Sequence, residues 1–265
     1  MSIATLVTAC IWFLVVPSFT CANEANVNCL KSIYSQVEDP NGYLSSWVFG
    51  NYAQGYMCKF NGVICWHDDE DRVMSLMLSG YGLRGEFPYG IWNCSDLTGL
   101  ELADNNFSGP LPSNIASLIP SLTILDLSGN SFSGEIPASL SNVTFLNTLM
   151  LQHNQFTGPL PPELALLERL SKFSVADNQL TGPIPNFNDA TLKMKPDDFA
   201  NNTDLCGMPL DACKPEEEGI IRPGKIGAAV GAALFAPLGA FLGWFFFSGR
   251  KEKQQHRSWI YHMEH

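Results

Sequence analysis

The chain has 265 residues and a net charge of −11, with 15 Lys and Arg side chains against 26 Asp and Glu side chains. This acidic balance argues against nucleic acids or heparin-like polyanions as partners. The five histidines form no metal or acid–base spacing with carboxylates, and the sequence contains no phosphate-binding loop or nucleophile elbow. We therefore expect no cofactor, no small-molecule substrate and no catalysis.

Residues 1–22 are expected to form a secretory signal peptide. Ile11 to Val16 is an apolar core, and the small residues Thr20 and Ala22 suit cleavage near Ala22. A strongly basic start is missing. The alternative, a first membrane helix, is disfavoured because the apolar core is short for a membrane span.

Residues 23–72 are predicted to cap the N-terminal end of the central region. After signal-peptide removal six cysteines remain, and an even number in a secreted chain predicts three disulfides, although six cysteines allow fifteen connectivities. These cysteines are Cys29, Cys58, Cys65, Cys94, Cys206 and Cys213. Cys58 with Cys65 and Cys206 with Cys213 can each close a short loop at one end of the central region. Cys29 and Cys94 are then left to pair, tying an N-terminal helix to the first repeat, but the sequence does not fix this pairing.

Residues 73–190 repeat a block of about two dozen residues five times. One position of the block is held by Leu76, Leu100, Leu125, Leu149 and Phe173. A later position is held by Tyr81, Asn105, Asn130, Asn154 and Asn178. This period is that of leucine-rich repeats, and we predict an α/β solenoid of five repeats with disulfide-stapled caps at both ends.

Each block reads as a short strand followed by a turn. Leu125, Asp126 and Leu127 alternate between apolar and polar, which predicts a strand with one buried face. The side chain of Asn130 is expected to satisfy backbone groups of neighbouring coils. The segment Phe132–Pro137 is expected to supply a second apolar layer, a tight bend at Gly134 and a proline that stops regular structure.

The amino-acid pattern of the blocks resembles that of a known family. Asn130 to Pro137 reads Asn-x-Phe-Ser-Gly-x-Ile-Pro, which resembles the plant-specific class of leucine-rich repeat. The segments Leu44–Trp47 and Cys58–Trp66 resemble the N-terminal cap of plant leucine-rich-repeat receptor kinases, and Asn202–Cys213, within the predicted C-terminal cap 191–213, resembles their C-terminal cap. Together these features are similar to the BIR group, pseudokinase receptors with small ectodomains that interact with SERK co-receptors.

The resemblance implies a negative regulator that keeps a SERK-type co-receptor away from ligand-binding receptors in immune and growth signalling. Members of the group carry a kinase-like domain after the membrane helix, whereas this sequence ends at His265 without a Gly-rich loop, strand lysine or catalytic loop. A truncated or spliced product and a natural receptor-like protein without a kinase both fit this observation.

The C-terminal part is predicted to cross a membrane once. Residues 214–225 form a juxtamembrane linker, 226–247 are 22 uncharged residues that can span a bilayer, and 248–265 form a short tail. Arg250, Lys251 and Lys253 follow the span, which places the tail in the cytoplasm. We therefore expect a type I protein of the plasma membrane with its repeats outside the cell and the lipid bilayer as a partner.

The strands are expected to present two columns of outward-pointing residues on the concave face. One column is Met77, Glu101, Asp126, Met150 and Ser174, and the other is Ser79, Ala103, Ser128, Gln152 and Ala176. Neither column predicts a strong pocket. We assign Asp126, Met150 and Gln152 to partner binding and expect the edge of the strands to take part as well.

A third position, just before the leucine that leads into each strand, is held by Asp96, Ser121, Phe145 and Arg169. Three of the four are polar, so the position is expected to face solvent, and Phe145 is the exception. Exposed aromatic and arginine side chains are enriched at interface hot spots, so we assign Phe145 and Arg169 to partner binding. The alternative places Phe145 under a neighbouring turn. Asp96, at the same register, is expected to contribute little.

Four sequons are candidates for N-glycosylation, at Asn93, Asn106, Asn142 and Asn201. The site at Asn93 is doubtful because Cys94 occupies its middle position. A glycan on Asn142, three residues from Phe145, would limit the approach of a partner.

Two classes of function remain. The first is a membrane-anchored binding protein that associates with a co-receptor ectodomain. The second is an extracellular inhibitor of cell-wall-degrading enzymes, which uses similar repeats. The predicted span and the small number of repeats favour the first class.

Overall fold

The computed structural model describes residues 20–50, 55–188 and 191–214. The described residues up to Cys213 belong to one compact unit, and of the second unit, Lys214–His265, only Lys214 is described. The predicted span at 226–247 and the tail at 248–265 lie outside the described residues, as does the predicted signal peptide up to residue 19. Within the described ranges, none of the helices has both the length and the apolar character that a membrane crossing needs.

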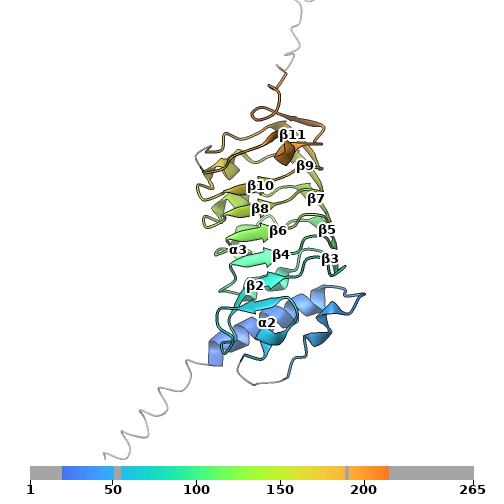
Figure 1. Cartoon of the computed structure of the whole chain (residues 1–265), viewed down its shortest axis with the longest axis vertical. Coiled ribbons are helices and arrows are strands. Elements are labelled where there is room, and N and C mark those ends of the chain that lie inside the picture. Colours follow the sequence, from blue (N-terminus) through green and yellow to red (C-terminus); the bar gives the residue numbers. More distant parts are fainter. Residues whose placement is uncertain (1–19, 51–54, 189–190, 215–265) are drawn as a thin grey trace, which may run out of the picture. The chain divides into compact units, whose positions relative to one another are not determined.

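The first sheet, which we name the inner sheet, stacks one short strand from each of the five predicted blocks and one strand, β1, from the N-terminal cap. Its strands are β1 (Val63–Cys65), β2 (Val73–Met77), β4 (Gly99–Glu101), β6 (Ile124–Asp126), β8 (Thr148–Met150) and β10 (Lys172–Ser174), in that order (Figure 1). β1 pairs antiparallel with β2, and all later pairs are parallel and in register. The leucine ladder from Leu76 to Phe173 is buried behind this sheet, as the alternating pattern predicts.

The second sheet lines an adjoining side of the stack (Figure 1). It consists of β3 (Arg84–Gly85), β5 (Asn106–Pro110), β7 (Ser131–Glu135), β9 (Gln155–Pro159), β11 (Gln179–Pro183) and β12 (Asp204–Cys206). The sequence predicted an apolar layer and a bend here but no strand. Phe107, Phe132 and Phe156 explain the layer, because their rings stack with centroids 6.0 and 6.4 Å apart and draw successive coils together.

Short helices follow the second sheet in each coil. They are η3 (Tyr89–Asn93), α3 (Ile115–Leu118), η4 (Ala138–Asn142), η5 (Pro162–Leu166) and η6 (Pro196–Phe199). Pro137, expected to stop regular structure, lies between β7 and η4 and has a φ of −65°. At the N-terminal end, α2 (Thr20–Gln36) packs on η3 and buries Leu30 and Ile33, with η1 (Tyr43–Ser46) and η2 (Met57–Lys59) completing the cap.

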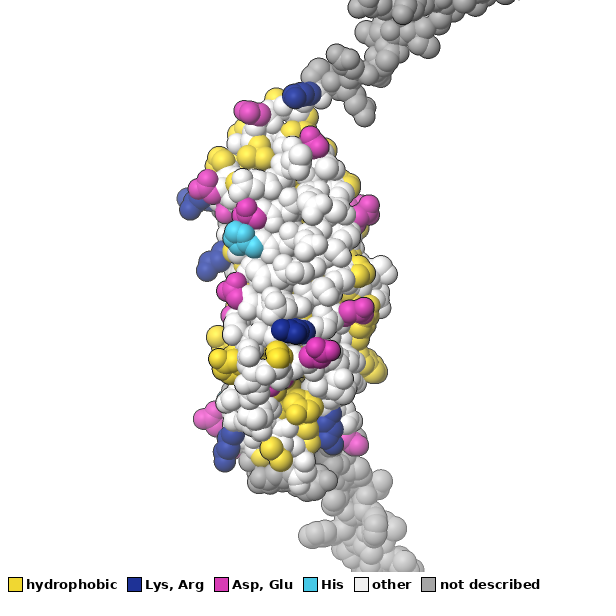
Figure 2. Space-filling view, turned by 90° about the vertical axis from the view of Figure 1, so that its right-hand side faces the viewer, with side chains coloured by type: hydrophobic (Ala, Val, Ile, Leu, Met, Phe, Trp, Pro, Cys, Tyr) yellow, Lys and Arg dark blue, Asp and Glu magenta, His cyan; other side chains and the backbone are white. Residues whose placement is uncertain are grey.

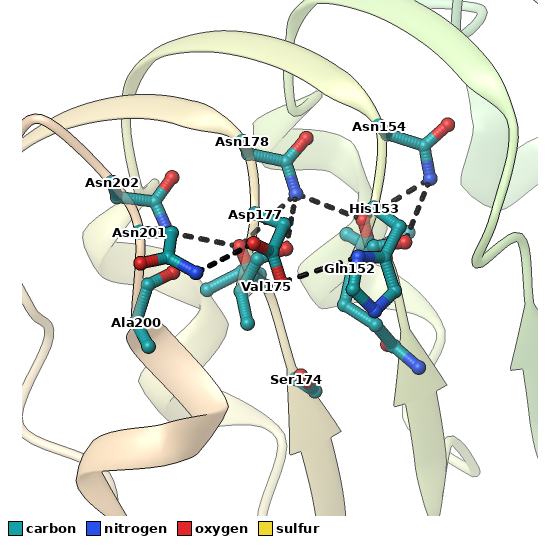
Figure 3. Close-up of polar contacts among 12 residues, drawn as sticks. Gln152, His153, Asn154, Ser174, Val175, Asp177, Asn178, Ala200, Asn201 and Asn202 are labelled. Carbon is teal, nitrogen blue, oxygen red and sulfur yellow. Dashed lines mark hydrogen bonds and ion pairs between the residues drawn. The ribbon is translucent and has the colours of Figure 1, made fainter.

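A ladder of asparagine side chains joins the coils. Asn154 shows the pattern: its Nδ2 donates to the carbonyls of Leu127 at 2.9 Å and of Leu151 and Gln152 at 3.2 Å. Its Oδ1 accepts the backbone N–H of Phe132 at 3.0 Å. The same bonds recur at every ladder position, including one in the C-terminal cap (Figure 3): Asn105, Asn130, Asn154, Asn178 and Asn202. The expectation for Asn130 is confirmed, because its amide bonds to backbone groups of its own coil and of the coil before it.

Three disulfides fasten the two ends. Cys58 pairs with Cys65 and Cys206 with Cys213, with Cα atoms 5.6 and 4.9 Å apart. Cys29 pairs with Cys94, with Cα atoms 5.4 Å apart, and links α2 to the coil that follows η3. The two pairs with short loops are those expected from the sequence, and the structure settles the Cys29–Cys94 pairing that the sequence left open.

Candidate protein-binding surface

One row of residues runs along the edge of the inner sheet where its parallel strands begin. Ser75, Gly99, Ile124, Thr148 and Lys172 are aligned across these strands. The residues three positions earlier are therefore aligned as well, and we name them the edge row: Arg72, Asp96, Ser121, Phe145 and Arg169. The sequence analysis identified four of the five and missed Arg72, although it lies one repeat period before Asp96.

Phe145 and Arg169 form a pair at the C-terminal end of the edge row. Phe145 is 48 % exposed, so the alternative that places it under a neighbouring turn is wrong. The guanidinium carbon of Arg169 lies 5.1 Å from the centre of the Phe145 ring. This cation–π geometry holds an aromatic face and a fixed positive charge side by side on the surface.

A second aromatic–arginine pair lies at the other end of the edge row. The guanidinium carbon of Arg72 is 6.0 Å from the centre of the Trp66 ring, and Trp66 is 44 % exposed. Arg72 also forms an ion pair with Asp96 at 2.9 Å, and the indole N–H of Trp66 donates to the Asp96 carbonyl at 3.2 Å. The hydrogen bond that the Arg72 guanidinium donates to the Asp96 carboxylate raises the pKa of Arg72 above its ordinary value, with the charge of Asp96 as the next cause.

The position of Asp96 corrects one expectation. The sequence suggested a solvent-facing carboxylate that contributes little. In the structure the Asp96 carboxylate accepts a hydrogen bond from Arg72, and the Asp96 backbone carbonyl accepts one from the indole of Trp66. Asp96 precedes β4, and pairing of β4 with β2 brings it next to these two residues of the cap. Asp96 is therefore unsuitable as an inert control for the edge row.

The first predicted column crosses the inner sheet as expected, except at its last member. Met77 is exposed and Glu101, Asp126 and Met150 are half-buried, whereas Ser174 is buried. Glu101 and Asp126 are aligned on neighbouring strands. Burial, and after it the negative charge of Asp126, raises the pKa of Glu101. The Asp126 carboxylate accepts the backbone N–H of Ser128 at 3.0 Å and its hydroxyl at 2.6 Å, which fixes its orientation.

The second predicted column is largely buried, which overturns part of the expectation. Ala103, Ser128 and Ala176 are buried, although the alternation pattern pointed them at solvent. Gln152 is half-buried, and its amide oxygen is buried without a hydrogen-bond partner. These residues are buried because they lie in the turn after each strand, where the neighbouring coil covers small side chains.

That turn places a residue of positive φ in every coil. Asp104, His153, Asp177 and Asn201 have φ angles of 53°, 57°, 54° and 55°, and Gly80 and Gly129 take the same register with 73° and 64°. Glycine, asparagine and aspartate tolerate this conformation best. The signal was present in the sequence as a Gly, Asp or Asn before most ladder asparagines, and the analysis did not use it.

The rest of the surface also carries exposed apolar side chains, among them Trp92 and Leu166. Figure 2 faces the second sheet, and the middle of this face carries mainly side chains that are neither charged nor hydrophobic. A hollow of about 380 Å³ lined by Leu111, Glu135, Pro137, Pro159 and Glu163, among others, contains none of the predicted partner-binding residues. In the ranges that the structure describes, no three His, Cys, Asp or Glu side chains are grouped so that they could hold a metal ion.

The sequons differ in accessibility. Asn106 and Asn142 are exposed, and Asn93 is half-buried beside the disulfide of Cys94. Asn201 is exposed, but its Nδ2 donates to Asp177 at 2.7 Å, and Asp177 also lies 3.2 Å from His153 (Figure 3). Glycosylation at these four positions stays a prediction.

The chain matches two family models and is similar to known plant receptor-like kinases. The model "Leucine rich repeat N-terminal domain" matches residues 23–66, and "Leucine Rich Repeat" matches 96–118, 121–143 and 145–167. A probably inactive leucine-rich repeat receptor-like protein kinase of Arabidopsis thaliana is 72 % identical over 205 residues, which cover 77 % of this chain and 33 % of that protein. The inactive receptor-like kinase BIR2 of the same plant is 46 % identical over 235 residues, which cover 87 % of this chain and 38 % of BIR2. The chain thus spans about a third of the length of these relatives.

Two solved structures from Arabidopsis thaliana resemble the fold over their full length. The BIR2 ectodomain has a TM-score of 0.69 at 39 % identity, covering 71 % of this chain and 98 % of that one. A chain of the BIR3–SERK2 complex has a TM-score of 0.67 at 41 % identity, covering 72 % of this chain and 100 % of that one.

Proposed function

Because this chain belongs to the BIR group of plant leucine-rich-repeat receptor-like kinases, we propose that its repeat domain binds the ectodomain of a SERK-type co-receptor. The observation that carries the proposal is the exposed Phe145–Arg169 pair on the edge row. The similarity to a chain crystallised in a BIR3–SERK2 complex supports the choice of partner.

Phe145 and Arg169 have the properties of interface hot spots. Aromatic and arginine side chains dominate binding energies when a partner removes them from water. The contact between the two already orders the flexible arginine, so binding costs less side-chain entropy. Asp126 and Met150, aligned on neighbouring strands of the inner sheet, extend the proposed contact, whereas the inward-turned amide oxygen of Gln152 makes it the weakest of the proposed contacts.

The predicted glycans restrict the direction from which the partner approaches. Asn93 and Asn142 each end a short helix, η3 and η4, three residues before Asp96 and Phe145 of the edge row. Glycans there would stand on the helix side of the row. A co-receptor would then contact the edge row from the side of the inner sheet.

We also propose that the chain is a plasma-membrane protein with extracellular repeats and that it regulates immune or growth signalling by occupying the co-receptor. In this role it needs no catalysis of its own, and the two relatives described above are named as inactive or probably inactive kinases. A bound co-receptor is unavailable to ligand-binding receptors, so binding alone suffices for inhibition.

A parallel pull-down tests the proposed function. The repeat domain is immobilised and offered a SERK-type ectodomain and a fungal polygalacturonase, the target class of the alternative inhibitor function. We expect retention of the SERK-type ectodomain only. Retention of the polygalacturonase alone would replace the proposed function with the inhibitor function.

A further inference from the structure

We propose that Trp66 and Arg72 form a second anchor of the co-receptor interface, at the cap end of the edge row. This inference rests on the proposed function, since it assigns a further part of the same interface to the same partner. The juxtaposition that carries it is an exposed tryptophan beneath an arginine at one end of the row and an exposed phenylalanine beneath an arginine at the other.

The two pairs lie at a distance that one partner can span. Arg72 and Arg169 are separated by four strand-to-strand steps of the inner sheet, or about 19 Å at the usual spacing. A specific interface of standard size covers roughly 800 Å² on each partner. A patch of that area is wider than the distance between the pairs, so a co-receptor seated on Phe145 also reaches Trp66.

Trp66 and Arg72 are held in place before any partner arrives. Arg72 contacts Asp96 at 2.9 Å and Glu70 at 3.5 Å, and its guanidinium lies over the Trp66 ring. The single donor of the indole is already used on the Asp96 carbonyl. What remains open on Trp66 is apolar ring surface in a fixed orientation, which binds with little loss of side-chain entropy.

The cap does not need Trp66 for its own packing. Its buried aromatic cluster is centred on Phe60, whose ring contacts those of Trp47, Tyr56 and the neighbouring Phe49. Trp66 lies outside this cluster and is exposed. Tryptophan and arginine are both among the residue types enriched at interface hot spots.

One exposed isoleucine lies on β1, two residues before Trp66, and another lies on β6, between the two anchors. Ile64 on β1 and Ile124 on β6 are both exposed, and each is aligned with the column of residues next to the edge row. The row also ends in an arginine on each side, Arg72 and Arg169. We therefore expect the co-receptor to present an apolar centre flanked by acceptor groups.

The test measures the affinity of the full chain, purified in detergent and immobilised, for the SERK2 ectodomain in solution. Trp66→Ala is compared with Phe145→Ala and with Trp92→Ala, a matched control because Trp92 is 64 % exposed on η3, outside the edge row. We expect Trp66→Ala to weaken binding at least about tenfold and Trp92→Ala less than about twofold.

The outcomes separate this inference from the proposed function. If Phe145→Ala weakens binding but Trp66→Ala stays within twofold of the unmodified chain, the second anchor is overturned and the proposed function stands. If the unmodified chain does not bind SERK2, the proposed function fails and the second anchor with it. Should Trp66→Ala melt at a lower temperature, Arg72→Ala decides by the same tenfold threshold, because its side chain is exposed and lies outside the core.

Discussion

At the scale of single residues, the ladder asparagines matter most to the stability of the stack. Each amide bonds to its own coil and to the coil before it, so one side chain satisfies backbone groups of two repeats. Leaving a buried donor or acceptor unpaired costs about 1–3 kcal/mol. Ladder positions therefore tolerate substitution less well than their exposed neighbours.

Asn154→Ala should lower the free energy of unfolding by at least about 2 kcal/mol, because the Phe132 N–H and the Leu127 carbonyl lose their partner. Denaturant unfolding of the purified repeat domain measures this loss. Gln155→Ala, at the exposed residue that follows, is the matched control and should change little. Equal stabilities of the two variants would mean that water or a neighbour takes over the bonds.

Glu101→Gln should stabilise the protein at neutral pH, by no more than about 1 kcal/mol, because it removes a like charge aligned with Asp126. Burial and the charge of Asp126 raise the pKa of Glu101, so between its unfolded and folded pKa the native state binds more protons than the unfolded state. Stability therefore falls as pH rises through this window.

The gain from Glu101→Gln should accordingly vanish below the pKa that the carboxyl has in the unfolded chain. Thermal melting of both proteins at pH 7 and at pH 3 tests this. A gain that is the same at both pH values would show that packing of the amide, and not charge, is responsible.

At this scale the sequence predicted the hydrogen-bonding role of single side chains better than it predicted their exposure to solvent. The ladder role of Asn130 followed from residue type and period alone. The sequence could not decide whether Phe145 is exposed. The orientation of its side chain depends on the path of the chain between the end of η4 and the start of β8. Arg72 and Trp66 could not be found from the leucine pattern, because Val73 holds the position in the first coil that Leu97 holds in the next.

At the scale of elements, the two ends of the stack are the places where apolar surface would be exposed to water, because a terminal coil has no neighbour to cover its apolar edge. The N-terminal end is covered by α2 and the cap aromatics, and the loop before β2 is closed by the Cys58–Cys65 disulfide. At the C-terminal end, η6 and β12 cover β10 and β11, and Phe199 packs against Phe173.

Replacing Cys58 and Cys65 together by serine should lower stability by about 2–5 kcal/mol, the usual cost of losing a native disulfide in a secreted domain. The melting temperature and the secreted yield measure it. If the double variant is secreted normally and melts at the unmodified temperature, the disulfide does not secure the cap.

The inner strands were predictable as elements because leucine alternates with polar residues there. The second sheet was not, because its segments contain glycine and in most coils proline, which disfavour strands. Those strands exist because each pairs with the same segment of the next coil, and the stacked phenylalanines hold the pairs together. Such pairing depends on the stack and not on the local sequence.

At the scale of the whole molecule, the proposed topology follows from charge and hydropathy in a part of the chain that lies outside the described residues. Protease added to intact cells should digest the repeat domain, because positive charge after residue 247 places the tail inside. Tail-specific antibody should still detect a protected fragment. Protection of the repeats instead would reverse the proposed orientation.

The central claim is that the edge row binds a SERK-type ectodomain through Phe145 and Arg169. Calorimetric titration of the purified repeat domain with that ectodomain tests it most directly, using Phe145→Ala and Arg169→Ala with Leu166→Ala and Arg84→Ala as exposed controls outside the row. Each of the two row variants is predicted to lose about 2 kcal/mol of binding free energy or more, while both controls bind like the unmodified domain. Equal affinity of all five proteins, or no binding by the unmodified domain, would contradict the claim.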